Sequence, residues 1–204
     1  NPDYLKNCMM PINVFWFRRD LRLEDNTGLF HALNSPFPVL PVFIFDTDIT
    51  DELPSDDARV TFIYEQLEML QESLKAYGSS MKIFKTTPEA AFRQLTELFE
   101  IKEVYVNRDY EPYAEKRDEK IMNYLKNKGI SFYPYKDQVI FEKGEVVKPN
   151  KQPYTVFTPF KNQWLREFEK LSCDFLPKKC VLDNLIKSDE HFPRLEHLGF
   201  KKSS

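Results

Sequence analysis

The sequence predicts an α/β fold: a five-stranded parallel, Rossmann-like sheet with helices on both faces. Three observations carry this prediction. Apolar segments of strand length alternate with helix-like segments up to residue 135. Residues 38–46 form a nearly continuous apolar run, which is typical of a strand covered on both faces. Residues 58–78 carry apolar side chains at spacings of three and four, as one buried helix face requires. This alternation indicates right-handed crossovers.

The first two strands are expected at residues 14–17 and 38–46. The first passes without a spacer into a charged turn, residues 18–25. Asn26 is a good N-cap for the helix-like residues 27–33. The second strand stops at a carboxylate, Asp46, and a polar loop follows.

The later elements repeat the same alternation. The long helix ends at Gly78, and Pro88 stands at the first position of the next helix. The remaining segments are a strand at 81–86, a strand at 103–107, a second charged turn at 107–111, a helix at 113–128 and a fifth strand at 130–135. We expect the nucleotide-binding strand order, with its switch beside the first strand.

The pattern changes after Asp137. Residues 139–147 resemble a small hairpin that turns at Lys143 and Gly144, and a helix is expected from Pro159 with Thr158 as its N-cap. The predicted division is an extension or cloning remnant at 1–10, an α/β domain at 11–137, a hairpin and helix packed on it at 138–171, and a linker at 172–204.

Composition excludes several classes of function. A net charge of −3 gives no electrostatic footprint for nucleic acid. Cys8, Cys173 and Cys180 lack metal-ligand spacing, which favours reduced thiols and a cytoplasmic setting. No apolar run reaches the length of a membrane span, so no membrane partner is expected.

Catalytic patterns are also absent from the sequence. Five glycines are too few for a phosphate-binding loop, and no serine lies in a nucleophile elbow. The three histidines stand apart from cysteines and carboxylates. His31 is expected to be a partly buried or capping residue, and no catalytic residue is predicted.

The two charged turns are the candidate binding site. They follow the first and fourth strands, which are neighbours in the expected sheet, so the turns should face each other across one crevice. Aromatic walls and a polar rim suit a flat heteroaromatic ligand. The rim and wall candidates are Arg19, Asp20, Arg22, Phe45, Asp46, Asn107, Asp109 and Glu111. Alternatively, the charges pair with one another: Arg18 and Arg22 with Glu24, Asp25 or Glu111.

Four motifs resemble the DNA photolyase and cryptochrome family. Residues 16–26 (Trp-Phe-Arg-Arg-Asp-Leu-Arg-Leu-x-Asp-Asn) are similar to its opening signature. Residues 107–113 with Arg117 and Asp118 are similar to its fourth-strand segment. Residues 154–164 are similar to its Tyr-x-Val-(Phe/Tyr)-x-Pro-Phe motif, and residues 57–62 to the start of its long second helix. The resemblance covers residues 11–171 and adds Leu21 and Arg59 to the candidate cofactor-binding residues.

The resemblance implies the N-terminal α/β domain of a deoxyribodipyrimidine photolyase, which holds a light-harvesting antenna chromophore. In the family, the antenna passes energy to FAD in a separate helical domain, and the reduced flavin repairs a pyrimidine dimer flipped out of DNA. That helical domain and, through it, damaged DNA are the implied partners. The FAD residues have no counterparts here, so the chain is expected to be inactive alone.

The resemblance also bears on the antenna. Members that hold methenyltetrahydrofolate carry an Asn-Glu pair where this chain has Tyr113 and Ala114, so a deazaflavin or FMN is expected instead. Two other interpretations stay open: a cryptochrome photoreceptor domain, and a nucleotide-binding or protein-interaction module without light chemistry.

Overall fold

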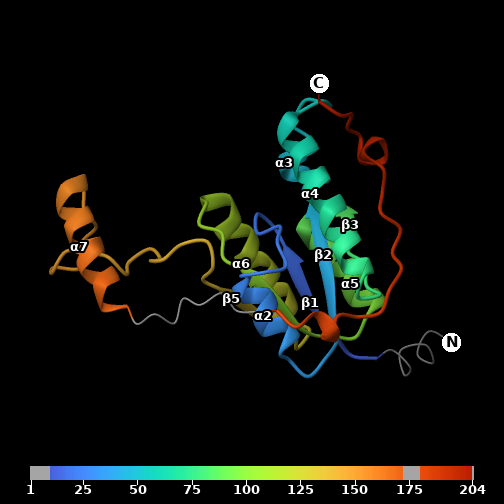
Figure 1. Cartoon of the computed structure of the whole chain (residues 1–204), viewed down its shortest axis with the longest axis horizontal. Coiled ribbons are helices and arrows are strands. Elements are labelled where there is room, and N and C mark those ends of the chain that lie inside the picture. Colours follow the sequence, from blue (N-terminus) through green and yellow to red (C-terminus); the bar gives the residue numbers. More distant parts are fainter. Residues whose placement is uncertain (1–9, 172–179, 204) are drawn as a thin grey trace.

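The computed structural model describes residues 10–171 and 180–203, and these form a parallel five-stranded sheet in the order β3-β2-β1-β4-β5 (Figure 1). The strands are β1 (Ile12–Phe17), β2 (Val39–Phe45), β3 (Lys82–Lys85), β4 (Ile101–Asn107) and β5 (Ser131–Tyr135). Strand β1 lies between β2 and β4, with Trp16 opposite Val42 and Val14 opposite Val104. The predicted fold class and strand order are confirmed.

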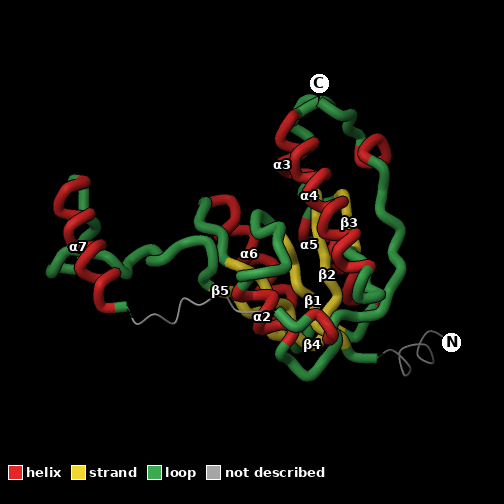
Figure 2. The backbone as a smooth tube through the Cα atoms, viewed as in Figure 1, coloured by secondary structure: helices red, strands yellow, loops and turns green. Residues whose placement is uncertain are grey.

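Helices cover both faces of the sheet (Figure 2). The α-helices of the described residues are α2 (Thr27–Leu33), α3 (Thr47–Thr50), α4 (Ala58–Lys75), α5 (Pro88–Leu98), α6 (Pro112–Lys126) and α7 (Phe157–Lys170), and α7 lies away from the sheet. One turn of helix, α3, lies where the sequence predicts only a loop, because Asp46 caps it by accepting a 3.1 Å hydrogen bond from the Asp48 amide.

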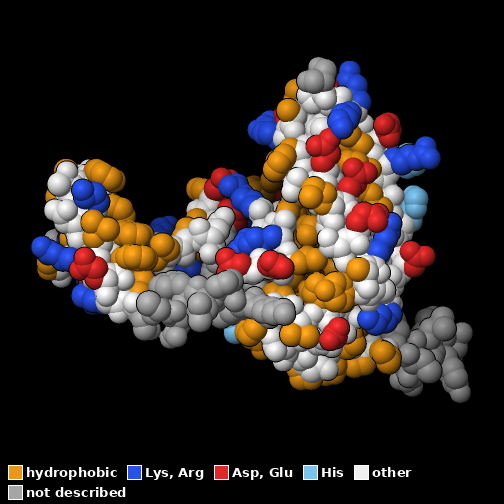
Figure 3. Space-filling view, in the orientation of Figure 1, with side chains coloured by type: hydrophobic (Ala, Val, Ile, Leu, Met, Phe, Trp, Pro, Cys, Tyr) orange, Lys and Arg blue, Asp and Glu red, His pale blue; other side chains and the backbone are white. Residues whose placement is uncertain are grey.

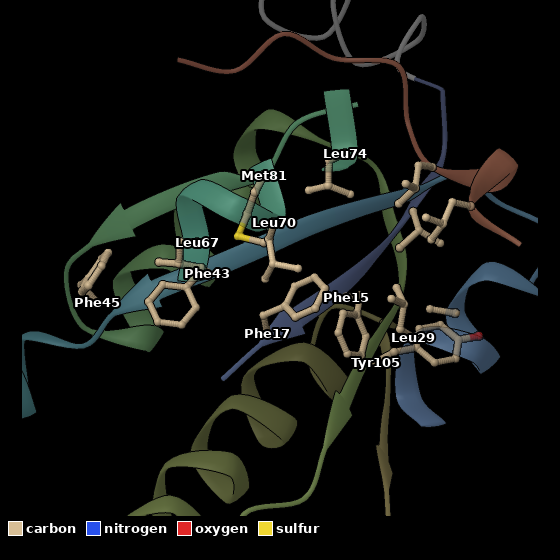
Figure 4. Close-up of a cluster of buried hydrophobic side chains, with 14 of the residues drawn as sticks. Phe15, Phe17, Leu29, Phe43, Phe45, Leu67, Leu70, Leu74, Met81 and Tyr105 are labelled. Atoms are coloured by element: carbon tan, nitrogen blue, oxygen red, sulfur yellow. The ribbon is translucent and has the colours of Figure 1, made fainter. Parts of the chain in front are cut away.

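Two buried clusters hold the layers together, and β1 contributes to both because successive side chains point to opposite faces. Phe15 and Phe17 join the cluster beneath α2 and α4, which Figure 4 shows with Leu70 beside them. Val14 and Trp16 join the cluster beneath α5 and α6. Every residue of β1 is buried, which explains why its sequence is apolar without alternation.

The predicted hairpin is wrong. The residues between β5 and α7 form turns and bends without a strand. Ion pairs shape this segment instead: Glu142 pairs with Arg108 at 2.5 Å, and Glu145 pairs with Lys136 at 2.9 Å. The two short apolar stretches, residues 139–141 and 146–147, form no strand, and the charged groups beside them are paired with each other or with Arg108.

Helix α7 differs from the prediction in its start and in its packing. It begins at Phe157, after Val156 and before Pro159, and Thr158 is not its cap. It buries no residue and stands apart from the sheet in Figure 1. It contacts the preceding segment through two T-shaped pairs of rings, Phe141 with Trp164 at 5.4 Å and Tyr154 with Phe160 at 6.2 Å between centroids.

The C-terminal segment was predicted to be a linker, but its described part, residues 180–203, packs on the domain. It contains two short 3₁₀ turns, η1 (Leu182–Asn184) and η2 (Leu195–Leu198), and it runs alongside α4 in Figure 1. Its buried apolar side chains are Leu182, Leu185, Leu195, Leu198 and Phe200. Extended chain carries no helical period, so periodicity alone does not reveal this packing. The rest of the predicted linker, residues 172–179, and Cys8 lie outside the described residues, as does most of the predicted extension.

No helix in the described part of the chain combines the length and the apolar character needed to cross a membrane.

Candidate functional site

The two charged turns meet at the carboxyl ends of β1 and β4. Arg19, just after β1, places Nε 3.4 Å from Oδ2 of Asp109 and Nη2 2.7 Å from Oε1 of Glu111, both after β4. Arg19 and Glu111 are more than half exposed, whereas Asp109 is mostly buried. The two turns come together, although they are about ninety residues apart in the sequence, because β1 and β4 are adjacent parallel strands.

A cavity of about 390 Å³ opens beside these turns. Its walls come from the ends of β1 and β2, from α3, from the start of α4 and from the start of α6. The lining residues are Trp16, Phe17, Arg18, Arg19, Phe43, Ile44, Phe45, Asp46, Ile49, Thr50, Leu53, Arg59, Val60, Ile63, Asp109, Glu111, Tyr113, Ala114 and Arg117. The walls are mainly apolar and the rim is charged, as in most small-molecule sites.

Helix capping positions two polar groups at this cavity. Asp46, at the end of β2, caps α3 and also accepts a 2.6 Å hydrogen bond from the hydroxyl of Tyr113. Burial raises the pKa of Asp46, and burial with the adjacent carboxylate raises the pKa of Tyr113. Arg59 lies in the first turn of α4, where the N-cap residue Asp57 pairs with it at 2.7 Å.

A buried ionic cluster forms the inner wall. Arg18 donates two hydrogen bonds to Asp118, at 2.9 and 2.7 Å, and one of 2.6 Å to the carbonyl of Asn107. Burial lowers the pKa of Arg18, although the Asp118 charge opposes this shift. Arg117 lies against the same carboxylate, with Nη2 3.0 Å from Asp118 Oδ1. Cζ of each arginine is 4.9 Å from the ring centroid of Trp16.

A second network lies beneath the turns. Asn107 Nδ2 donates to Asp20 Oδ2 at 2.5 Å and to Asn26 Oδ1 at 2.8 Å, and Asn107 Oδ1 accepts from the Gly28 amide at 2.8 Å. The other Asp20 oxygen accepts from the Arg18 amide at 2.8 Å. Burial raises the pKa of Asp20, and its hydrogen bonds oppose that shift. This network links both turns to the start of α2.

The structure divides the ten predicted site residues into three groups. Six line the large cavity: Arg19, Phe45, Asp46, Arg59, Asp109 and Glu111. Asp20, Arg22 and Asn107 line a separate polar pocket of about 40 Å³, which Arg19 and Asp109 also border. Leu21 belongs to neither lining and packs against the cluster beneath α2 and α4.

The alternative pairing scheme is realised with different partners. Arg22 pairs with Asp137 at 2.6 Å and also donates to the carbonyl of Asp25, while Arg18 pairs with Asp118. Asp118 and Asp137 are distant in the sequence from their arginines, so local charge patterns do not reveal these two pairs.

Thirteen of the nineteen lining residues were not predicted as site residues, and among them are Trp16, Tyr113, Ala114 and Arg117. Trp16, Tyr113 and Arg117 lie within the motifs quoted above and Ala114 follows Tyr113 directly, and a signal for Arg117 and Ala114 was available. Ala114 and Arg117 are three residues apart in α6, which places them on one helix face. Both side chains are buried.

Comparisons with known proteins show the family of this chain. The sequence model of the family described as DNA photolyase matches residues 13–180. The deoxyribodipyrimidine photo-lyase of Synechococcus sp. (strain ATCC 27144 / PCC 6301) is 32% identical over 151 residues, which are 74% of this chain and 31% of that protein.

Two solved structures match as well. An archaeal photolyase from Sulfolobus tokodaii gives a TM-score of 0.62 at 33% identity, covering 76% of this chain and 34% of that one. A bacterial class III photolyase from Agrobacterium tumefaciens gives a TM-score of 0.74, covering 92% and 38%; at 24% identity it shows the shared fold alone. The chain thus spans about a third of the length of these photolyases. The matched fold and sequence together establish that this chain belongs to the DNA photolyase family.

Proposed function

We propose that this chain is the light-harvesting domain of a deoxyribodipyrimidine photolyase and that its large cavity binds a flavin-type antenna chromophore. The observation that carries the proposal is the cavity itself: aromatic walls from β1 and β2 beneath a charged rim from both turns. A volume of about 390 Å³ lies within the usual range for small-molecule sites.

The polar groups of the cavity suit such a chromophore. Phe17, Phe43 and Phe45 offer apolar surface for a flat ring system. Arg117 Nη2 is buried and has no hydrogen-bond partner among the described residues, since its contact with Asp118 lacks hydrogen-bond geometry. A buried donor of this kind favours an acceptor on a ligand. Arg59 at the rim suits a phosphate.

The choice between flavin and folate rests on α6. Tyr113 and Ala114 occupy the positions of the Asn-Glu pair in folate-binding members, and the Tyr113 hydroxyl is already bonded to Asp46. The Sulfolobus tokodaii photolyase is described with two FAD molecules and a novel light-harvesting cofactor, which supports a flavin. We therefore favour FMN or a deazaflavin over methenyltetrahydrofolate.

The whole protein's activity follows from its relatives. Several are deoxyribodipyrimidine photo-lyases, so we infer light-driven repair of pyrimidine dimers, with FAD and damaged DNA bound by a further helical domain. This domain alone supplies no catalytic residue in the proposal. A bound chromophore would supply light absorption and energy transfer, and the chain's own residues orient it and exclude water.

A titration tests the cavity and the choice of ligand together. Purified protein is titrated with FMN, a deazaflavin, methenyltetrahydrofolate and an adenylate, with chromophore fluorescence or competition as the readout. We expect saturable binding of FMN or the deazaflavin, weakened about tenfold by Asp109→Ala if one charge-assisted hydrogen bond is lost. The control Asp183→Ala changes an exposed carboxylate away from the cavity. Exclusive adenylate binding would support a nucleotide-binding module without light chemistry.

A cryptochrome function is the second candidate, because cryptochromes also occur among the relatives. Blue-light repair of an ultraviolet-damaged oligonucleotide by a protein that joins this domain to its helical partner distinguishes them. Repair supports the photolyase, and flavin photochemistry without repair supports the cryptochrome.

A further inference from the structure

Five aromatic side chains line the cavity, and they differ in how readily they give up an electron. Phe17, Phe43 and Phe45 have rings that resist one-electron oxidation. Trp16 and Tyr113 carry electron-rich indole and phenol rings. An excited flavin is a strong oxidant, so these two rings are the groups in the lining that would quench it.

Both oxidisable rings lie against the same guanidinium. Cζ of Arg117 is 4.9 Å from the Trp16 ring centroid and 5.9 Å from the Tyr113 ring centroid. Cζ of Arg18 is also 4.9 Å from the Trp16 ring. Trp16 is therefore in contact with two cations, whereas Tyr113 is in contact with one.

Two guanidinium groups lie within ion-pair distance of one carboxylate here, and the carboxylates of Asp20 and Asp46 act on them from farther away. Arg18 and Arg117 share the single carboxylate of Asp118, at 2.7 and 3.0 Å. The side chains of Arg18 and Arg117 are 7% and 8% exposed, so solvent and salt screen this positive charge weakly. At Tyr113 the Asp46 carboxylate, 2.6 Å from the hydroxyl, offsets part of the effect.

We propose that Arg117, together with Arg18, keeps Trp16 and Tyr113 from quenching the excited state of a flavin bound in the cavity. This inference rests on the proposed function. Quenching would transfer one electron from the indole to the excited flavin and would leave the indole as a radical cation. The electron then returns, both rings are restored, and the excitation is lost as heat. A guanidinium beside the ring raises the energy of the radical cation. The electron transfer is then less favourable and slower, so the excitation lasts long enough to be passed on.

Time-resolved fluorescence of FMN bound to the full chain tests this proposal through a double-mutant cycle. Arg117→Met, which removes the charge, should shorten the lifetime of bound FMN about threefold or more, because the electrostatic barrier to oxidising Trp16 falls. Arg117→Lys, which keeps the charge, should leave the lifetime close to that of the wild type. Trp16→Phe should have no effect alone and should restore the lifetime in part when added to Arg117→Met, since Tyr113 also lies against this guanidinium and remains.

The contrary results are distinct. If Trp16→Phe alone lengthens the lifetime several-fold, Trp16 quenches despite the arginines and the proposal is wrong. This single variant can overturn the proposal even where Arg117→Met fails to fold or to bind FMN, and Arg117→Lys against the wild type then supplies the second comparison. An unchanged lifetime in folded, FMN-bound Arg117→Met also overturns the proposal, while leaving the proposed function intact. A wild-type chain that binds no FMN overturns the flavin assignment and this inference with it.

Discussion

Asn107, the last residue of β4, donates a 2.5 Å hydrogen bond to the carboxylate of Asp20, three residues beyond the end of β1. Both side chains are buried. This bond joins the two turns from beneath, while the Arg19 pairs with Asp109 and Glu111 join them at the rim. The turns therefore hold their relative positions through a buried neutral-to-charged bond rather than through exposed ion pairs, which contribute little.

The first prediction concerns the pH dependence of stability. Burial raises the pKa of Asp20 above its ordinary value of 3.8, so the folded state binds the Asp20 proton more tightly than the unfolded state. Its contribution is therefore full below pH 3.8 and is lost as pH rises through the folded-state pKa. Compared with Asp20→Asn, the wild type should lose free energy of unfolding over this interval. Urea unfolding at a series of pH values measures both free energies of unfolding, and a wild type that gains stability relative to Asp20→Asn as the pH rises would contradict the prediction.

The second prediction concerns Gly28 in the first turn of α2. A Cβ atom there would lie 2.8 Å from Asn107 Oδ1 and 2.9 Å from the Phe15 ring. Gly28→Ala should therefore lower the free energy of unfolding by about 1–3 kcal/mol, because neither neighbour can move without breaking packing or hydrogen bonds. Thr27→Ala, one residue earlier, removes atoms without adding any and should change stability by less than about 0.5 kcal/mol. Equal unfolding midpoints for the two variants would show that the close approach is absent.

The third prediction concerns the C-terminal segment. Leu198 is 4% exposed in the cluster beneath α2 and α4. Leu198→Ala should lower the free energy of unfolding by about 2–5 kcal/mol through lost burial and a cavity. Val181→Ala, at a residue that is 57% exposed, serves as the control and should have little effect. A Leu198→Ala protein as stable as the control would mean that the segment does not pack on the domain.

The parts of the structure that could be predicted are those with a local signal. The spacing of apolar residues gives α4, and the uninterrupted apolar runs give β1 and β2, because burial on both faces leaves no polar alternation. The meeting of the turns follows from strand order, since β1 and β4 are neighbours. By contrast, the packing of Leu198 has no period to reveal it, because the segment is extended with single 3₁₀ turns.

The site was predicted in outline, and its inner wall was not. Asp46 and Asp109 line the cavity because they end their strands or follow them directly. Asp20 likewise follows a strand, but its side chain is buried and accepts a hydrogen bond from Asn107 instead of lining the large cavity. The contact of Arg117 with Trp16 depends on how α6 packs against β1, and no local pattern encodes that distance.

The central claim is that the large cavity is the chromophore site, and filling it tests the claim most directly. Ala114 is 2% exposed and lines the cavity, whereas Ala76 lies on the exposed end of α4. FMN binding is measured by equilibrium fluorescence for the wild type, Ala114→Phe and Ala76→Phe, each shown to be folded by circular dichroism. The account predicts saturable binding by the wild type and Ala76→Phe and a loss of about tenfold or more in Ala114→Phe, since the added ring occupies ligand space. Equal FMN affinity in all three folded proteins would contradict it.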